Sequence, residues 1–205
     1  MTPTKGGKAN RLSLPFFLRY MRMQLLKAIN AILPALGEHP VTRVDVKHPT
    51  LAVIIPVIEA KLRETLMRDW WFNTSEITLY PDTEGRIYVP TTTLVFIPRK
   101  VRATVRRLQL YNQEALNFIW TEPVEGRLKE TMEFDELPES VASYVMYSAL
   151  VQTYVTDIGL ESVVERWDSV AKQAEFLATN EHLQNMKYST QKSSRYGRLR
   201  SAMRG

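Results

Sequence analysis

Within four residues, Trp70–Asn73, the spacing of apolar side chains changes from a helical to a strand-like period, and this change constrains the fold more than any other feature. Before it, apolar residues from Ile58 to Trp70 recur at intervals of four, which is the spacing of one face of an α-helix. After it, Glu76–Tyr80 alternates polar and apolar residues up to a Pro-Asp pair, which is typical of a short strand ended by a turn. A long helix therefore passes directly into a sheet.

Four segments have the period or the composition of an α-helix, and each has its own start or stop signal. We expect helices at about residues 21–36, 50–71, 138–158 and 160–180. Gly37 suits the left-handed position that ends the first helix, and Pro138 suits the first turn of the third. Because Pro56 lies within the second segment, the sequence predicts either a kink there or a later helix start near Ile55.

Between the second and third helices, residues 74–134 contain short runs of strand-forming residues separated by turn signals. The runs are Glu76–Tyr80, Arg86–Val89, Thr93–Ile97, Ala103–Tyr111, Ala115–Trp120 and Arg127–Phe134. Asn112-Gln113 falls between two of them and predicts a hairpin tip. Since no long helix separates the runs, we expect an α+β fold: an antiparallel bundle of about four helices, with a small antiparallel β lobe inserted between helices two and three, and extended termini.

The third helix contains 17 consecutive residues, 140–156, without Lys, Arg, Asp, Glu or His. A helix with no charge around its circumference is either central in a bundle or covered by a neighbouring subunit. For the second alternative, the residues predicted to contact another subunit are Tyr147, Ala149, Leu150 and Tyr154.

Charge is distributed unequally along the chain. Of the 27 Lys and Arg residues, 6 lie in residues 1–27 and 6 in residues 187–205, and neither segment contains Asp or Glu. The remaining 15 bases stand against all 22 acids, which gives the central part a net charge of −7. The sequence thus predicts a basic N-terminal arm over residues 1–20, an acidic domain over residues 21–186 and a basic tail over residues 187–205.

Residues for the common catalytic and metal sites are missing or badly spaced. The chain has no cysteine, which excludes thiol nucleophiles and cysteine-ligated zinc. The three histidines are His39, His48 and His182. None pairs with another His or an acid at the spacing that metal ligands have on a helix. Four acids near the third helix are better explained as charges at its N-terminus than as catalytic carboxylates, namely Glu133, Asp135, Glu136 and Glu139. We expect no enzymatic activity and no cofactor or metal.

No apolar run approaches the roughly 20 residues that a membrane-spanning helix needs, so no membrane association is expected. The tryptophans are interpreted as core or subunit-interface anchors rather than base-stacking platforms, at Trp70, Trp71, Trp120 and Trp167.

Several short motifs occur in an order, and with gaps, that together resemble one known family. They are Ala28–Leu33, Leu36–Val41, Trp71–Thr74 and Thr78–Asp82, with the long helix between the second and the third. In this arrangement the chain resembles tail tubular protein A, the head-to-tail adaptor family of short-tailed (podovirus) bacteriophages. The resemblance covers residues 28–82 without a gap and returns loosely at Phe134–Glu139.

This resemblance implies a structural protein of the virion tail or neck, assembled in the cytoplasm of the bacterial host. Members of the family form a ring of twelve copies beneath the portal protein, extend the channel through which DNA passes without sequence recognition, receive the tail nozzle protein and help to hold the tail fibres. A closed ring needs two different, complementary faces on each subunit. The uncharged third helix suits one of them.

Two sets of residues are assigned to the other partners. Portal contact is predicted at Arg195, Tyr196, Arg198, Leu199 and Arg200. Nozzle or fibre contact is predicted at turns of the β lobe, at Asp82, Glu84, Gly85, Asn112 and Gln113.

A nucleic-acid-binding protein that acts through its basic terminal arms is the alternative, because twelve bases in two segments could neutralise several phosphates. The acidic body and the absence of a base-readout motif count against it. The basic segment Arg99–Arg107 leaves a similar choice open, between an edge strand protected by charge and a patch that faces DNA.

Overall fold

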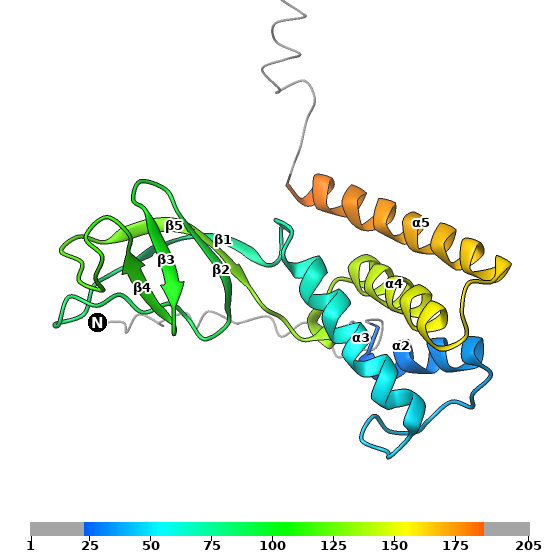
Figure 1. The fold of residues 1–205 in the computed structure, drawn as a ribbon. Helices are drawn as coiled ribbons and strands as arrows, with labels where there is room; N and C mark the ends of the chain where they lie inside the picture. The colour runs from blue at the N-terminus through cyan, green and yellow to red at the C-terminus, as the bar shows by residue number, and fades with distance from the viewer. Residues whose placement is uncertain (1–22, 187–205) are drawn as a thin grey trace, which may run out of the picture.

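The computed structural model describes residues 23–186, in which a helical body carries a β lobe that projects from one side (Figure 1). The body consists of α2 (Leu25–Ile32), the 3-10 helix η1 (Leu33–Leu36), α3 (Pro49–Leu66), α4 (Glu139–Asp157) and α5 (Ser162–Asn185). The lobe consists of β1 (Thr74–Leu79), β2 (Thr93–Pro98), β3 (Ala103–Arg106), β4 (Gln109–Asn112) and β5 (Val124–Glu130), and the 3-10 helix η2 (Phe134–Glu136) leads back to the body. Over these residues the predicted α+β class is confirmed, with the lobe inserted between α3 and α4.

The first predicted helix begins later than expected, at Leu25, and ends as expected at Gly37, whose φ is +79°. Its N-terminus is held by acids from a distant part of the chain. The backbone N–H of Met23 donates to a Glu139 carboxylate oxygen at 2.6 Å, and that of Leu25 donates to Asp135 at 2.6 Å. From the sequence, these carboxylates were interpreted as negative charges at the N-terminus of the third predicted helix. That helix is α4, and its first turn does include Glu139. They also satisfy the free N–H groups at the start of α2, where negative charge is favourable.

Helix α3 starts at Pro49 and continues through Pro56, so the later start near Ile55 is wrong. Pro56 is exposed, which lets its ring face solvent instead of a packed neighbour. The helix ends at Leu66, several residues before the predicted end at 71. The apolar spacing continues to Trp70, but a tight loop replaces the last helical turn.

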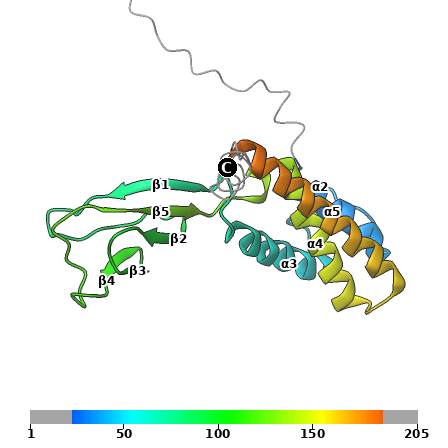
Figure 2. The same ribbon diagram turned by 90° about the horizontal axis from the view of Figure 1, so that it is seen from above.

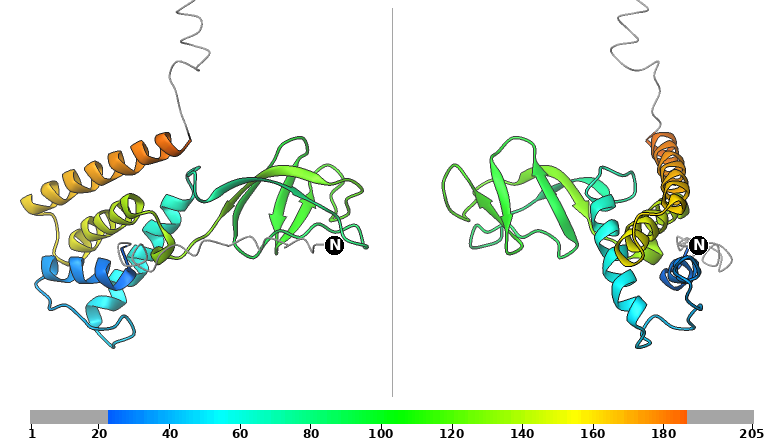
Figure 3. Two further views of the ribbon diagram at one scale, coloured as in Figure 1. Left: turned by 180° about the vertical axis from the view of Figure 1, so that it is seen from behind. Right: turned by 45° about the vertical axis from the view of Figure 1, so that its right-hand side comes forward.

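Helix α4 is central in the body, which is the first of the two alternatives for an uncharged helix. It lies between α2, α3 and α5, and runs antiparallel to α5 (Figures 1 and 3). Its buried side chains include Val141, Ala142, Val145, Met146, Ala149 and Leu150. Burial within one chain therefore accounts for the lack of charge.

The lobe holds two antiparallel sheets and a core of its own. One sheet has the strand order β1-β5-β2 and the other pairs β3 with β4 (Figure 2). Its core consists of Ile87, Phe96, Leu110, Trp120, Val124 and Leu128. The small antiparallel sheet is confirmed, although the predicted strand Ala103–Tyr111 is divided by a turn at Arg107-Leu108, and Ala115–Trp120 contributes only isolated bridges.

The junction between body and lobe is held by the side chain of Asn73, which is 2% exposed. Its amide nitrogen donates to the carbonyl of Leu66 at the end of α3, at 2.8 Å, and its amide oxygen accepts the N–H of Trp70 at 3.2 Å. The backbone carbonyl of Asn73 accepts the N–H of Glu130 at the end of β5, at 2.9 Å. One residue thus ties the last turn of α3 to the first strand of the sheet.

Asn73→Ala should lower the free energy of unfolding, because it leaves the buried carbonyl of Leu66 without its donor and removes one of the two acceptors of the Trp70 N–H, which keeps only the carbonyl of Arg68. The unpaired carbonyl alone costs about 1–3 kcal/mol. Urea unfolding followed by tryptophan fluorescence measures it, with Asn185→Ala on the exposed end of α5 as the control, expected to stay within about 0.5 kcal/mol of the parent. Equal midpoints for both variants would contradict this role.

Ala149→Asp should prevent folding or lower the free energy of unfolding by more than about 3 kcal/mol, because residue 149 has no exposed surface and the carboxylate would have no partner. Gln152→Asp, on the exposed side of the same helix, is the matched control. Circular dichroism during thermal unfolding reads out both. A folded Ala149→Asp protein with the stability of the control would remove α4 from the core.

Candidate functional site

The far end of the β lobe carries the first of the predicted contact turns, at Asp82–Gly85. One Asp82 carboxylate oxygen accepts the backbone N–H of Glu84 at 2.9 Å and that of Arg86 at 2.8 Å. Gly85 has a φ of +76°, a conformation in which a side chain would be strained. The turn is therefore held in one shape by its own hydrogen bonds.

The second predicted turn, at Asn112-Gln113, is fixed in a similar way. The Asn112 side-chain oxygen accepts the N–H groups of Glu114 at 2.9 Å and Ala115 at 3.0 Å. The Asn112 backbone N–H donates to the carbonyl of Asn117 at 2.8 Å, which closes the loop. A turn is confirmed here, although the hairpin of β3 and β4 closes at Arg107-Leu108 instead.

The structure joins these two turns, which are about thirty residues apart in the sequence, through Ile119 and Trp120. The backbone N–H of Trp120 donates to the carbonyl of Gly85 at 2.7 Å, and Arg86 bridges to Ile119. A Cβ added to Gly85 would lie 3.2 Å from Ile119 Cγ2, so the absence of a side chain allows this close approach. The residues predicted for nozzle or fibre contact thus share one connected part of the lobe.

Large apolar side chains lie exposed on the same lobe. Tyr80 is 71% exposed, Leu116 73%, Ile119 50% and Tyr88 49%. Sequence reasoning did not single them out, because nothing in the spacing distinguishes an exposed leucine in a loop from a buried one. Exposed apolar side chains of this size are candidates for contact with another protein.

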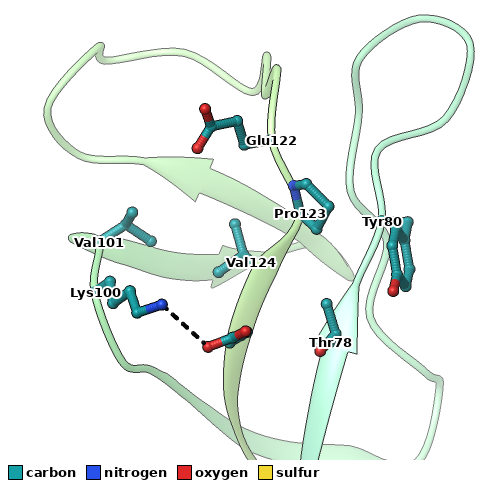
Figure 4. Close-up of a pocket in the computed structure, with 8 residues that line it drawn as sticks. Thr78, Tyr80, Lys100, Val101, Glu122, Pro123 and Val124 are labelled. Carbon is teal, nitrogen blue, oxygen red and sulfur yellow. Dashed lines mark ion pairs between the residues drawn. The ribbon is translucent and has the colours of Figure 1, made fainter.

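A hollow of about 390 Å³ lies beside the β1-β5 strands (Figure 4). Lys100 and Glu125 form an ion pair on its wall, with 3.4 Å between nitrogen and oxygen. Thr78, Tyr80, Val101 and Pro123 complete most of the lining. Glu122 also lines the hollow and forms no ion pair within residues 23–186, so the hollow holds one ion pair and one unpaired carboxylate.

Ion pairs link the lobe to the end of α3. Asp69 pairs with Lys129 at 2.6 Å and with Arg127 at 2.9 Å, both on β5. The hydrogen bond from Lys129 lowers the pKa of Asp69, and the charges of Lys129 and Arg127 act in the same direction. On the other side of the junction Arg68 pairs with Glu175 of α5 at 2.6 Å.

The remaining predicted residues fall in several environments. Ala149, Leu150 and Tyr154 are buried within the chain, so a second subunit cannot reach most of their surface, while Tyr147 is half-buried. Trp70 and Trp120 are core residues, as interpreted, and Trp71 and Trp167 are half-buried. The predicted portal residues, from Arg195 to Arg200, lie outside the described residues.

In residues 23–186 there is no group of three or more His, Asp or Glu residues placed to hold a metal ion. Among the helices of that part, none is long and apolar enough to cross a membrane.

Comparison with known proteins identifies the family. A family model described as tail tubular protein matches residues 26–188. Tail tubular protein A of Klebsiella phage KP34 is 29% identical over 182 residues, which cover 88% of this chain and 98% of that relative. The match extends over both the helical body and the β lobe. The chain therefore belongs to the tail tubular protein family and is a structural component of a bacteriophage tail.

Proposed function

We propose that this chain is the head-to-tail adaptor of its phage: a ring of copies between the portal and the nozzle protein that extends the DNA channel and supports the tail fibres. The proposal is supported by a hydrogen-bonded junction that joins a helical body to a β lobe with contact regions of its own. The Asn73 junction fixes the β lobe to the helical body, and the lobe presents hydrogen-bonded turns and exposed apolar side chains away from that body. Twelve copies is the number that the family resemblance implies.

Contact between neighbouring subunits is assigned mainly to the outer surface of α5. Phe176 is 64% exposed and Leu177 54%, and Leu160 in the turn before α5 is 85% exposed. Tyr147 on α4 keeps its predicted role, since part of its surface is accessible. A cyclic ring requires that this surface meet a different one on the next copy.

Both ends of the described chain leave from the same end of the body. Met23 is hydrogen-bonded to Glu139 at the start of α4, and the next residue, Ser140, is hydrogen-bonded to Glu181 near the end of α5. The basic tail, residues 187–205, therefore starts close to where the N-terminal arm joins. We assign portal contact to this tail, through Arg195, Tyr196, Arg198, Leu199 and Arg200.

The shared origin of the two basic segments also favours the second candidate function, binding to nucleic acid. Eleven Lys and Arg residues outside the described part would start from one end of the body, where they could neutralise phosphates. Sizing chromatography at low and high salt, with and without duplex DNA, separates the two functions. Salt-sensitive DNA binding by a monomer favours the second candidate, and rings on a portal favour the first.

A chain that ends after Met186 should remain folded, because the described helices and strands lie within residues 23–186, but it should no longer join portal complexes. Cosedimentation with the purified portal protein of the same phage measures attachment. A full-length variant with lysine in place of the four tail arginines is the control for charge, since it keeps the tail and its net charge. Full occupancy of the portal by the truncated chain would contradict the tail assignment.

Phe176→Glu should leave the monomer folded, because the side chain is mostly exposed, but should block ring closure by placing an unpaired charge in a subunit contact. Gln173→Glu, exposed one turn earlier on the same helix, adds the same charge outside the apolar surface. Rings assembled on the portal are counted by electron microscopy. Equal numbers of rings for the two variants would show that the outer surface of α5 is not an interface.

A further inference from the structure

Helix α5 turns its large apolar side chains away from the body. In its second half Phe176 is 64% exposed, Leu177 54% and Leu183 38%. Its buried side chains are smaller, namely Val164, Ala171, Ala174 and Ala178. A helix on the surface of a globular domain ordinarily does the reverse, with the larger apolar residues toward the core. Because small side chains remove little apolar area from water, the hydrophobic contribution that holds α5 to the body is low for a helix of 24 residues.

Two residues of α5 connect it to the core of the helical body. Ala178 is buried within that core, and Trp167 packs against it while it remains half-buried. The large, fully buried side chains come from the other helices, for example Ile32 of α2, Ile58 of α3 and Val145 of α4. Helix α5 therefore covers this core and supplies little of it.

Polar and aromatic contacts hold the second half of α5 in place. Glu175 pairs with Arg68 at 2.6 Å, and Glu181 accepts the hydroxyl of Ser140. The ring of His182 lies against the tryptophans of the junction. The Arg68 side chain is 45% exposed and that of Glu175 36%, so water can solvate both charges when the pair separates, and the pair adds little to stability.

The turn between α4 and α5 has the features of a hinge. Gly159 has a φ of +114°, and a Cβ added there would meet no atom within 4 Å. On either side of it, Ile158 is 44% exposed and Leu160 85%. The side chains of this turn thus make little contact with the body that would oppose a change of its backbone angles.

The helix that α5 covers is the uncharged α4. Ser140, near the start of α4, is bonded to Glu181 near the end of α5, and Tyr154, near the end of α4, donates to Glu161 just before α5 at 2.8 Å. The two helices therefore lie side by side along their lengths (Figures 1 and 3). Since residues 140–156 contain no Lys, Arg, Asp, Glu or His, displacement of α5 would expose a surface depleted of charge, as the centre of a protein interface is.

We propose that α5 is an autoinhibitory strap. In the free subunit it covers the surface of α4, and during assembly it opens at the Gly159 turn, so that α4 and the large apolar side chains of α5 both become available to the neighbouring copy. The inference rests on the proposed ring and adds a means by which subunits are kept from closing a ring too early.

The position of the basic tail suggests what opens the strap. Residues 187–205 continue directly from the end of α5. A tail attached to the portal would therefore act on α5, and it would favour the open form to the extent that it binds that form more tightly. Ring formation would then follow contact with the portal.

Hydrogen exchange on the full-length free subunit tests the opening by itself. The backbone amides of Ala171–Ala178, which lie more than a turn from either end of α5, should exchange at least about tenfold faster than those of Val145–Leu150 in α4. Equal rates would show that α5 opens only when the whole subunit unfolds, and this result would overturn the proposal.

A cross-link tests whether opening is needed for assembly. Because the chain has no cysteine, Ser140→Cys combined with Glu181→Cys can be joined selectively by a short bismaleimide. The linked subunit should stay folded but form no rings on the purified portal protein, as counted by electron microscopy, whereas the unlinked double variant should form them. Equal numbers of rings from the linked and unlinked subunits would contradict the strap.

The matched control places the same linker in the lobe, between Thr78→Cys and Glu125→Cys, which lie opposite each other on β1 and β5. This subunit keeps α5 free and should form rings; a loss of rings here as well would overturn the assignment of the effect to α5. A parent chain that forms no rings on the portal would reject the adaptor function and this inference with it. A parent and a linked subunit that assemble alike would reject only the strap.

Discussion

The hydrogen bonds of the Asn73 side chain are the interaction on which the rest of this structure depends. The side-chain amide binds the carbonyl of Leu66 at the end of α3 and the N–H of Trp70 in the loop, and the backbone carbonyl of the same residue accepts the N–H of Glu130 where β1 meets β5. The surrounding aromatic residues reinforce it: Trp70 packs on Phe72, with a centroid distance of 6.0 Å, and on His182 of α5, at 5.6 Å. Because Asn73 and Trp70 are buried, rotation of the lobe relative to α3 would leave polar groups unpaired.

This junction explains how a chain with two separate cores can act as one body. Trp70 belongs to the core of the helices, while Trp120 closes the core of the lobe. Between them, the ion pairs of Asp69 with Lys129 and Arg127 add a second link on the exposed side. In such a subunit, the position of the helices within an assembly also determines the position of the turns of the lobe.

Sequence periodicity predicted much of this fold, and the exceptions have more than one physical cause. The uncharged α4 and the stop at Gly37 were predictable, because local pattern and chain geometry determine them. The early end of α3 depends on the side chain of Asn73, which lies seven residues after Leu66, whereas the acids that hold Met23 and Leu25 lie more than 100 residues away. The turn at Arg107-Leu108 was missed because it lacks the glycine or asparagine that normally signals one. Of the proposed site, the Asp82 and Asn112 turns were predictable from turn residues, but the connection between them and the exposed Leu116 were not.

We propose that one subunit links the portal to the tail through separate contact regions. Electron cryomicroscopy of the intact virion tests this claim most directly, by fitting the subunit into the density of the neck. We expect a closed ring of this chain between portal and nozzle, with the turns of the lobe against the nozzle or the fibres. Density for the chain elsewhere in the virion, or a ring in which the lobe touches no other tail protein, would contradict it.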